Sequence, residues 1–334
     1  RVDPETESAR GFPRLPAEPG TPVVRLLFPN QPPPMSPRSI LLLLPVTALV
    51  ALISATSVAQ DRTTAQNRTT SGTASLDAEG TVVVENHEGR ITIEAWDRAE
   101  VKYNAVVRPE PDADHPEATT VQVDRGESRF VLRTEYDEDK ESDDGSFWNV
   151  GQNIMPVEYT LTVPRGARVA IDDHESDIRV RDLAGSVSIE THDGEIELAD
   201  LEGNVDLESH DGPIRVKNQS GALTIDTHDS DVRLRSVNGR VEIDADDSDI
   251  EAEGLRGGLD VDMHEGDGRF DFAELTDDVE FDTHDGVFTL LFPADTGFDL
   301  RTDFDDEEAT LRADVDLSPF RVVEDDDDDE VNYV

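Results

Sequence analysis

Apolar and polar residues alternate through the central part of the chain, and this pattern returns at a constant interval without a slip in register. Seven copies occupy residues 165–182, 183–200, 201–218, 219–236, 237–254, 255–274 and 275–292. The sixth copy carries two additional residues, and the first is the weakest. An alternation with a period of two is typical of strands whose alternate side chains face a core. Each copy is therefore predicted to form two short strands joined by turns.

Glycines mark the two corners of a copy, as Gly203 and Gly212 do in the third one. A turn often requires a positive φ angle, which costs little only for glycine. A single copy cannot bury its apolar face, so successive copies must stack on one another. The sequence thus predicts an all-β protein, a right-handed parallel β-solenoid of about seven 18-residue coils spaced about 4.8 Å apart.

The region before the repeats is predicted to form an N-terminal β cap. Residues 81–110 are strand-like and contain the same turn at His87, which suggests an eighth, displaced coil, and residues 121–123, 130–134 and 157–163 supply further strands. A solenoid needs such a cap because its open end exposes strand edges.

The rest of the chain is divided by composition. A short apolar run from Ile40 to Ile53, followed by small residues up to Ala59, predicts a secretory signal peptide cleaved after Ala59, because the run is too short to span a bilayer as a helix. We therefore expect no transmembrane helix in the mature chain and a location in the periplasm, on the outer surface or outside the cell. The expected segments are 1–34, a disordered leader or an over-extended gene start; 35–59, the signal peptide; 60–77, a polar linker; 78–164, the cap; 165–292, the solenoid; 293–323, a C-terminal β extension; and 324–334, an acidic tail.

Charge narrows the possible partners. The chain has 77 acidic and 29 basic residues, a net charge of −48, and no cysteine. Disulfides, thiolate metal sites and cysteine catalysis are therefore excluded, and nucleic acid is an unsuitable partner because its phosphates would be repelled. Abundant aspartate and only three lysines resemble the composition of proteins from extreme halophiles, with inorganic cations as counterions. A disordered acidic chain is the other explanation of this charge, but the strict period argues against it.

Seven of the eight histidines, counting His87, occupy one position of the repeat, and the next residue is acidic in all seven coils. Stacked coils would place these residues in two adjacent columns. Three interpretations compete: turn chemistry in which the aspartate caps its own turn, a column that binds cations, and catalysis. Turn chemistry is favoured, and catalysis is disfavoured because the same pair recurs without distinct roles. Candidate metal ligands are His192, Asp193, His210, Asp211, His228 and Asp229.

The order of motifs resembles the bacterial putative-adhesin family of β-strand-repeat proteins. The motifs are Ile91-Thr-Ile-Glu-Ala-Trp-Asp97, Val101-Lys-Tyr103, Tyr159-Thr-Leu-Thr-Val-Pro164 and the repeated Leu-x-Gly-x-Val-x-Ile with Asp-Gly-x-Ile-x-Leu, across residues 78–293. The resemblance implies an exported, single-stranded parallel β-helix without a known catalytic site. The regular histidine and the acidic end at residues 299–334 depart from the family pattern.

Together these observations predict a non-enzymatic, adhesin-like binding surface or scaffold at the cell envelope, with no catalytic residues and no cofactor. Its expected partner is an envelope polysaccharide or another envelope protein. The alternatives are a polysaccharide-acting β-helix enzyme and a cation-binding or pH-sensing envelope protein that uses the histidine column. Trp96 and Trp148 are weak candidates for stacking on a sugar, and a capping or packing role is the favoured explanation of each.

Overall fold

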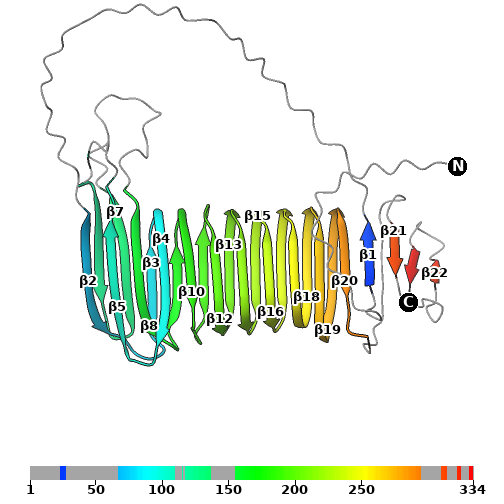
Figure 1. Ribbon diagram of the computed structural model, residues 1–334, viewed down its shortest axis with the longest axis horizontal. Helices are drawn as coiled ribbons and strands as arrows, with labels where there is room; N and C mark the ends of the chain where they lie inside the picture. The colour runs from blue at the N-terminus through cyan, green and yellow to red at the C-terminus, as the bar shows by residue number, and fades with distance from the viewer. Residues whose placement is uncertain are drawn as a thin grey trace, which may run out of the picture.

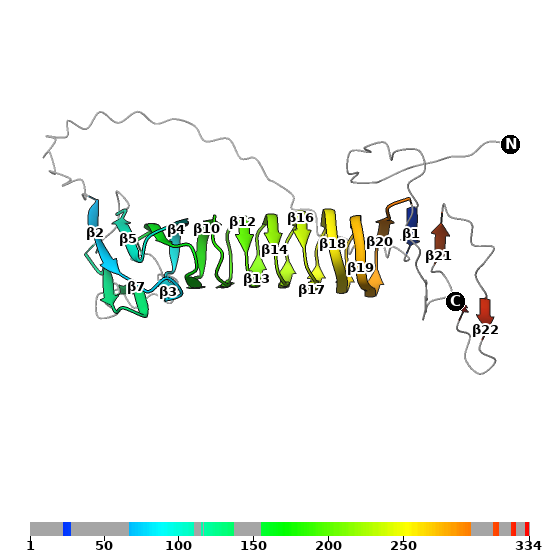
Figure 2. The same ribbon diagram turned by 90° about the horizontal axis from the view of Figure 1, so that it is seen from below.

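The computed structural model describes residues 67–109, 115, 117–136 and 155–294. It also describes the backbone of short strands at residues 23–27, 310–313, 322–324 and 331–333. The expected signal peptide, its cleavage point and Trp148 lie outside the described residues. The described chain is a long stack of strands with the N-terminal cap at one end (Figures 1 and 2).

The stack has two faces, which we name the first and the second sheet. The first sheet contains β3 (Thr81–Glu85), β9 (Arg168–Asp172), β11 (Val187–Thr191), β13 (Val205–Asp211), β15 (Leu223–Asp229), β17 (Val241–Asp247) and the C-terminal halves of β18 (Ile250–Glu265) and β19 (Gly268–Asp285). The second sheet contains β4 (Glu88–Trp96), β10 (Glu175–Arg181), β12 (Ile196–Glu202), β14 (Ile214–Ser220), β16 (Val232–Asn238), the N-terminal halves of β18 and β19, and β20 (Val287–Leu291).

All strand pairs within the repeats are parallel, and they are in register except between β18 and β19, where the pairing shifts between Glu253 and Leu259 around the two additional residues. Leu207 of β13, for example, pairs with Ile189 below it and with Ile225 above it, each exactly one copy of the repeat away. The same side-chain position therefore recurs at every level, as the period predicts. The predicted parallel β-solenoid is confirmed.

The core is a set of apolar columns between the two sheets. Ile189, Leu207 and Ile225 of the first sheet and Ile196 and Ile214 of the second are at most 1% exposed. Burial of each such side chain contributes about 1.5–3 kcal/mol. Because one coil supplies only a few of these residues, its stability depends on the coils on either side.

The two corners are built differently. At the corner after the second sheet, Asp182, Asp200, Asn218 and Ser236 all have φ between 52° and 62°, the left-handed region in which aspartate and asparagine are tolerated. At the other corner Gly194 has φ of 119°, and a Cβ atom there would lie 2.2 Å from the carbonyl oxygen of Ser176 in the coil below. Glycine is needed at that corner for both conformation and space.

The N-terminal cap contains five strands: β2 (Arg68–Ser75), β5 (Glu100–Val107), β6 (Thr119–Arg125), β7 (Arg129–Tyr136) and β8 (Val157–Pro164). The coil formed by β3 and β4 is inserted between β7 and β8 on one side and β9 and β10 on the other. This is the displaced coil that the His87 turn suggested. The antiparallel partners β2 and β6 cover the outer strands β5 and β7.

Three segments differ from the division expected from composition. β2 lies within the expected linker 60–77, and its antiparallel pairing with β5 extends the cap to Arg68. β1 (Val23–Leu27), in the segment expected to stay outside the fold, pairs antiparallel with β20 and with β21 (Thr310–Ala313). β22 (Val322–Glu324) and β23 (Val331–Tyr333) form a separate two-stranded sheet that reaches into the expected acidic tail. The part of the chain that the structure describes holds no helix able to span a bilayer.

Candidate functional site

The repeated histidines form a ladder at the edge of the first sheet. The rings of His87, His174, His192 and His210 follow one another with centroid distances of 4.7, 5.1 and 4.6 Å and interplanar angles of at most 8°. His228 continues the ladder at 4.7 Å with a tilt of 33°, and Asp246 occupies the next level. The last two levels pair His264 with His284 at 5.2 Å. The predicted histidine column is thus confirmed as a stack of exposed or half-buried imidazoles.

A second column of carboxylates lies beside the ladder, two residues before each histidine position. Residues that share this position pair level by level in the first sheet and point to the same side as the histidines, because side chains two apart share a face. The column consists of Glu85, Asp172, Glu190, Glu208, Asp226, Asp244, Asp262 and Asp282. It is acidic at every level, and the sequence analysis missed it.

The two sheets differ in how their charges are balanced. No lysine or arginine occurs in the first-sheet strands β11, β13, β15 and β17, or in residues 259–265 and 279–285. In the second sheet Arg179 contacts Glu197 at 2.8 Å and Glu195 at 3.3 Å, and Arg235 contacts Glu253 at 3.4 Å. The outer surface of the second sheet is therefore largely ion-paired, whereas that of the first sheet carries a concentrated negative charge.

Local contacts show how the acidic column is held. At its N-terminal end Arg133 of β7 donates to Glu85, with a distance of 2.8 Å from Nη2 to Oε1, and this hydrogen bond lowers the pKa of Glu85. In the middle of the column, burial raises the pKa of Asp244, and the neighbouring Asp226 and Asp262 raise it further. Of the first-sheet acids outside this column, Asp260 accepts a hydrogen bond of 2.7 Å from Arg240, which lies just before β17 in the adjacent coil.

In two coils the turn after the histidine is closed by the hydroxyl of the residue before it. Thr191 Oγ1 donates to the carbonyl oxygen of Asp193 at 3.1 Å, and Ser209 Oγ donates to that of Asp211 at 3.3 Å. The Asp193 and Asp211 carboxylates lie 3.4 and 3.3 Å from Nδ1 of His192 and His210, respectively. The expectation that the aspartate caps its own turn is wrong for these two coils, because each carboxylate lies against the adjacent imidazole and the preceding hydroxyl makes the side-chain contact to the turn backbone.

At the first regular coil an aspartate takes the place of that hydroxyl. Asp173, 7% exposed, accepts hydrogen bonds from the backbone N–H of Ser176 at 2.6 Å, from Ser176 Oγ at 2.7 Å and from Thr191 Oγ1 at 3.3 Å. Burial nevertheless raises the pKa of Asp173. Ser176 also accepts a hydrogen bond from Asn86, which bonds in turn to Thr134. A buried polar network therefore joins the cap to the repeats.

His87 lies at the covered end of the ladder. The pKa of His87 is lowered, first by burial and then by the adjacent His174, and the neighbouring Glu175 opposes this shift. Its Nδ1 atom is buried, and the ring meets Tyr136 edge-on at 5.7 Å. His87 thus forms the covered end of the ladder, under the cap.

The ladder, the acidic column and the inner hydroxyls line a groove of about 510 Å³ that extends over several coils, from His174 to Asp246. Among the candidate ligands, the structure brings together His192, His210 and Asp211, whose ligand atoms all lie within 4.8 Å of one another. Asp193 lies on the level of His192, and His228 lies on the level after His210, with its Nε2 atom 3.5 Å from Asp246 Oδ2. Asp229 pairs in register with Asp211.

Trp96 is explained by packing. Its indole Nε1 donates to the carbonyl oxygen of Glu100 at 2.8 Å, and the Arg98 guanidinium lies 4.7 Å from the ring centroid. The ring is thereby tied to the turn between β4 and β5.

Comparisons with known proteins complete the description. The family model described as Toastrack DUF4097 matches residues 81–318. Among solved structures, the chain is similar to the crystal structure of a "putative cell adhesion protein" from Clostridium sporogenes, with 7% sequence identity and a TM-score of 0.27, over 64% of this chain and 100% of the other. A search of curated proteins finds no significant match.

Proposed function

This chain belongs to the Toastrack DUF4097 family, and from that premise we propose that it is an exported, non-enzymatic scaffold of a salt-adapted bacterium. Its first sheet would act as an adhesin-like binding surface at the cell envelope. The observation that carries the proposal is the acidic column beside the histidine ladder, repeated level by level on one side of the solenoid.

The regular spacing of this surface favours an extended ligand. Equivalent carboxylates recur about every 4.8 Å along the stack, so the same contact can be made many times by a polymer that lies along the groove. An enzyme site needs a single constellation in which an acid, a base and a binding group have distinct environments. The groove instead repeats one pair of residue types from level to level, as Glu190 with His192 and Glu208 with His210 illustrate.

The charge of the surface selects the chemistry of that polymer. Anionic polymers would be repelled by acidic strands that lack lysine and arginine, whereas neutral sugars can donate hydroxyl hydrogen bonds to carboxylates and amino sugars can add ion pairs. We therefore expect a neutral or amino-sugar-containing envelope polysaccharide. Export rests on residues 35–59, whose short apolar run and small residues are typical of a signal peptide.

The proposal is tested by a pull-down from envelope extract at high salt with the full chain as bait. One variant, Glu190→Gln/Glu208→Gln/Asp226→Asn, neutralises three levels of the acidic column. The control, Asp182→Asn/Asp200→Asn/Glu202→Gln, makes the same change in charge at the opposite corner. Asparagine tolerates the left-handed conformation at the first two control positions.

We expect polysaccharide to be retained by the parent chain and by the control but lost with the first-sheet variant. Retention by all three proteins, or by none, would contradict the proposal. Release of new reducing ends or unsaturated sugars during the incubation would indicate the polysaccharide-acting enzyme instead. A captured envelope protein in place of a glycan would overturn the polysaccharide assignment.

A further inference from the structure

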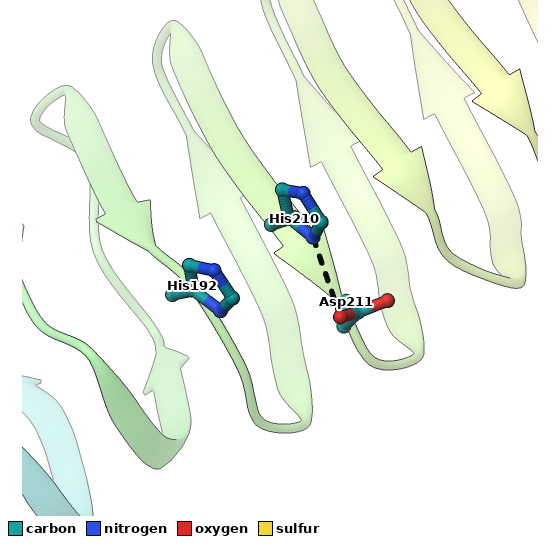
Figure 3. A group of neighbouring side chains, drawn as sticks. All are labelled: His192, His210 and Asp211. Atoms are coloured by element: carbon teal, nitrogen blue, oxygen red, sulfur yellow. Dashed lines mark hydrogen bonds and ion pairs between the residues drawn. The ribbon is translucent and has the colours of Figure 1, made fainter.

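Two levels of the ladder carry a group of side chains with the composition of a metal site. Figure 3 shows His192 and His210 side by side on neighbouring coils, with Asp211 next to His210. The two rings are 4.6 Å apart and nearly parallel, with an angle of 7° between them. Each residue offers one ligand atom, and the three atoms lie within 4.8 Å of one another. Among the described residues this is the one group of three with that property.

We propose that His192, His210 and Asp211 bind one divalent transition-metal ion of the zinc class. Nitrogen and carboxylate ligands bind zinc at about 2.0–2.2 Å, so two ligand atoms of one ion lie at most about 4 Å apart. The observed separation, up to 4.8 Å, exceeds this by about 1 Å or less. His192 and His210 have side chains that are 50% and 49% exposed, so small rotations of the two rings can close the difference.

The backbone already fixes the spacing that such a site needs. His192 and His210 occupy equivalent positions of successive coils, and the backbone N–H of Asp211 donates to the carbonyl oxygen of His192 at 2.8 Å. The two levels are therefore hydrogen-bonded to each other directly at the proposed site. Because the coils are held in register on both sides, binding has to order only the three side chains.

Other levels of the ladder are less suitable. The ring of His228 is tilted by 33° relative to that of His210, and its Nε2 lies near the Asp246 carboxylate. His264 and His284 are 5.2 Å apart, and Glu265 is 4.0 Å from His264 Nδ1. His87 is partly covered by the cap. The rings of His174 and His192 are parallel to within 8° but lie 5.1 Å apart. The closest approach of two parallel, exposed rings beside a carboxylate therefore occurs at His192 and His210.

The ligand types and the surroundings indicate which ion fits. Calcium and magnesium take oxygen ligands, whereas two imidazoles with one carboxylate suit zinc, nickel or copper. Glu190 and Glu208 stand beside the two rings in the acidic column, and the strands β11, β13 and β15 carry no lysine or arginine. The resulting negative potential raises the local concentration of divalent cations. Three protein ligands leave a coordination position open to water or to a donor group from a partner.

The test is isothermal titration of the full, chelator-treated chain with zinc chloride in 1 M NaCl, with cobalt absorption spectra as a second measurement. We expect one high-affinity site per chain and cobalt bands characteristic of mixed nitrogen and oxygen ligands. His210→Asn should weaken zinc binding at least tenfold, whereas His115→Asn, which removes a histidine outside the ladder, should leave the affinity unchanged. Circular dichroism of both variants without metal verifies that each is folded.

Three results would overturn the assignment. They are equal zinc affinity in His210→Asn and the parent chain, an equal loss of affinity in His264→Asn, and displacement of zinc by equimolar calcium. The last of these would show a diffuse cation atmosphere. This inference does not depend on the proposed polysaccharide, because the titration contains no partner and the pull-down variants retain His192, His210 and Asp211.

Discussion

The acidic column predicts that the solenoid loses stability when salt is removed. Its six regular members, Glu190, Glu208, Asp226, Asp244, Asp262 and Asp282, make five neighbouring pairs along the first sheet. Carboxylates about 5 Å apart repel by about 0.8 kcal/mol per pair in water, so the column costs about 4 kcal/mol without screening. Such a cost is a large part of the roughly 5–15 kcal/mol that holds a typical domain folded.

Screening decides how much of this repulsion is felt. At 1 M salt the screening length is about 3 Å and leaves roughly a fifth of the repulsion, whereas at 0.05 M it is more than about 10 Å and leaves roughly two-thirds. Moving from 1 M to 0.05 M NaCl should therefore lower the free energy of unfolding by about 2 kcal/mol through this column alone. Urea unfolding followed by far-UV circular dichroism measures this quantity, because urea carries no charge.

A paired variant separates the column from the total charge. Glu208→Gln/Asp226→Asn removes three of the five pairs and should reduce the salt-dependent loss to about 0.8 kcal/mol. Glu79→Gln/Glu202→Gln makes the same change in charge at exposed positions outside the column, and it should keep most of the loss. The reasoning is refuted if both variants show the same salt dependence, or if the parent chain is equally stable at the two concentrations.

Three further predictions concern protonation and packing. Burial raises the folded-state pKa values of Asp244 and Asp267 above the ordinary 3.8, so the folded protein binds more protons than the unfolded chain. The free energy of unfolding should therefore rise as pH falls from 7 through those pKa values and level off near pH 4. Glu85, whose folded pKa is lowered by Arg133, acts in the opposite sense, and the stability that it contributes should be lost as pH falls below about 4.5. A free energy of unfolding, measured with urea, that decreases steadily from pH 7 to 5 would contradict the expected rise. Gln219, 1% exposed, occupies a core column otherwise filled by leucine and valine, and its Oε1 atom has no hydrogen-bond partner. Gln219→Leu should therefore stabilise the protein by about 1 kcal/mol. A loss of stability would show that the two hydrogen bonds donated by its Nε2 atom outweigh this gain. Leu207→Ala should cost about 2–5 kcal/mol in the same assay because the rigid coils on either side prevent collapse of the cavity, and a change below about 1 kcal/mol would indicate a loosely packed core.

The regular coils could be predicted from the sequence because every strand pair that defines them joins neighbouring copies of the repeat. The constant period of the repeat fixes the pairs Ile189 with Leu207 and Ile196 with Ile214, and every such pair spans the same short length of chain. The cap is different. Thr81 pairs with Arg168, and no spacing rule connects these positions. The sequence suggested a displaced coil at His87, but its place between two later segments follows from long-range packing.

The site was partly predictable for a similar reason. A histidine is rare enough in this chain that its regular recurrence could be noticed, and the ladder followed from stacking. The acidic column alternates between glutamate and aspartate in a chain already rich in both, so its members, such as Glu208 and Asp226, were not distinguished from background. Counting residues two before each histidine, on the same side of the strand, would have revealed it. The role of the preceding hydroxyl, as in Thr191, depends on side-chain direction at a corner, which periodicity does not specify.

The inserted coil of β3 and β4 has a consequence for the order in which the protein folds. Its contacts with β10 join segments far apart in the sequence, as Ile91 with Ile178, whereas each later coil closes on the copy just before it, as Ile196 does on Ile178. Long loops slow the formation of contacts, so the regular coils should nucleate first and β3 and β4 should dock late. During synthesis this segment must wait, without its partners, until the chain beyond Arg181 is available. Pulse-labelling hydrogen exchange should therefore show protection of β14 before β4, and the reverse order would mean that growth starts at the cap.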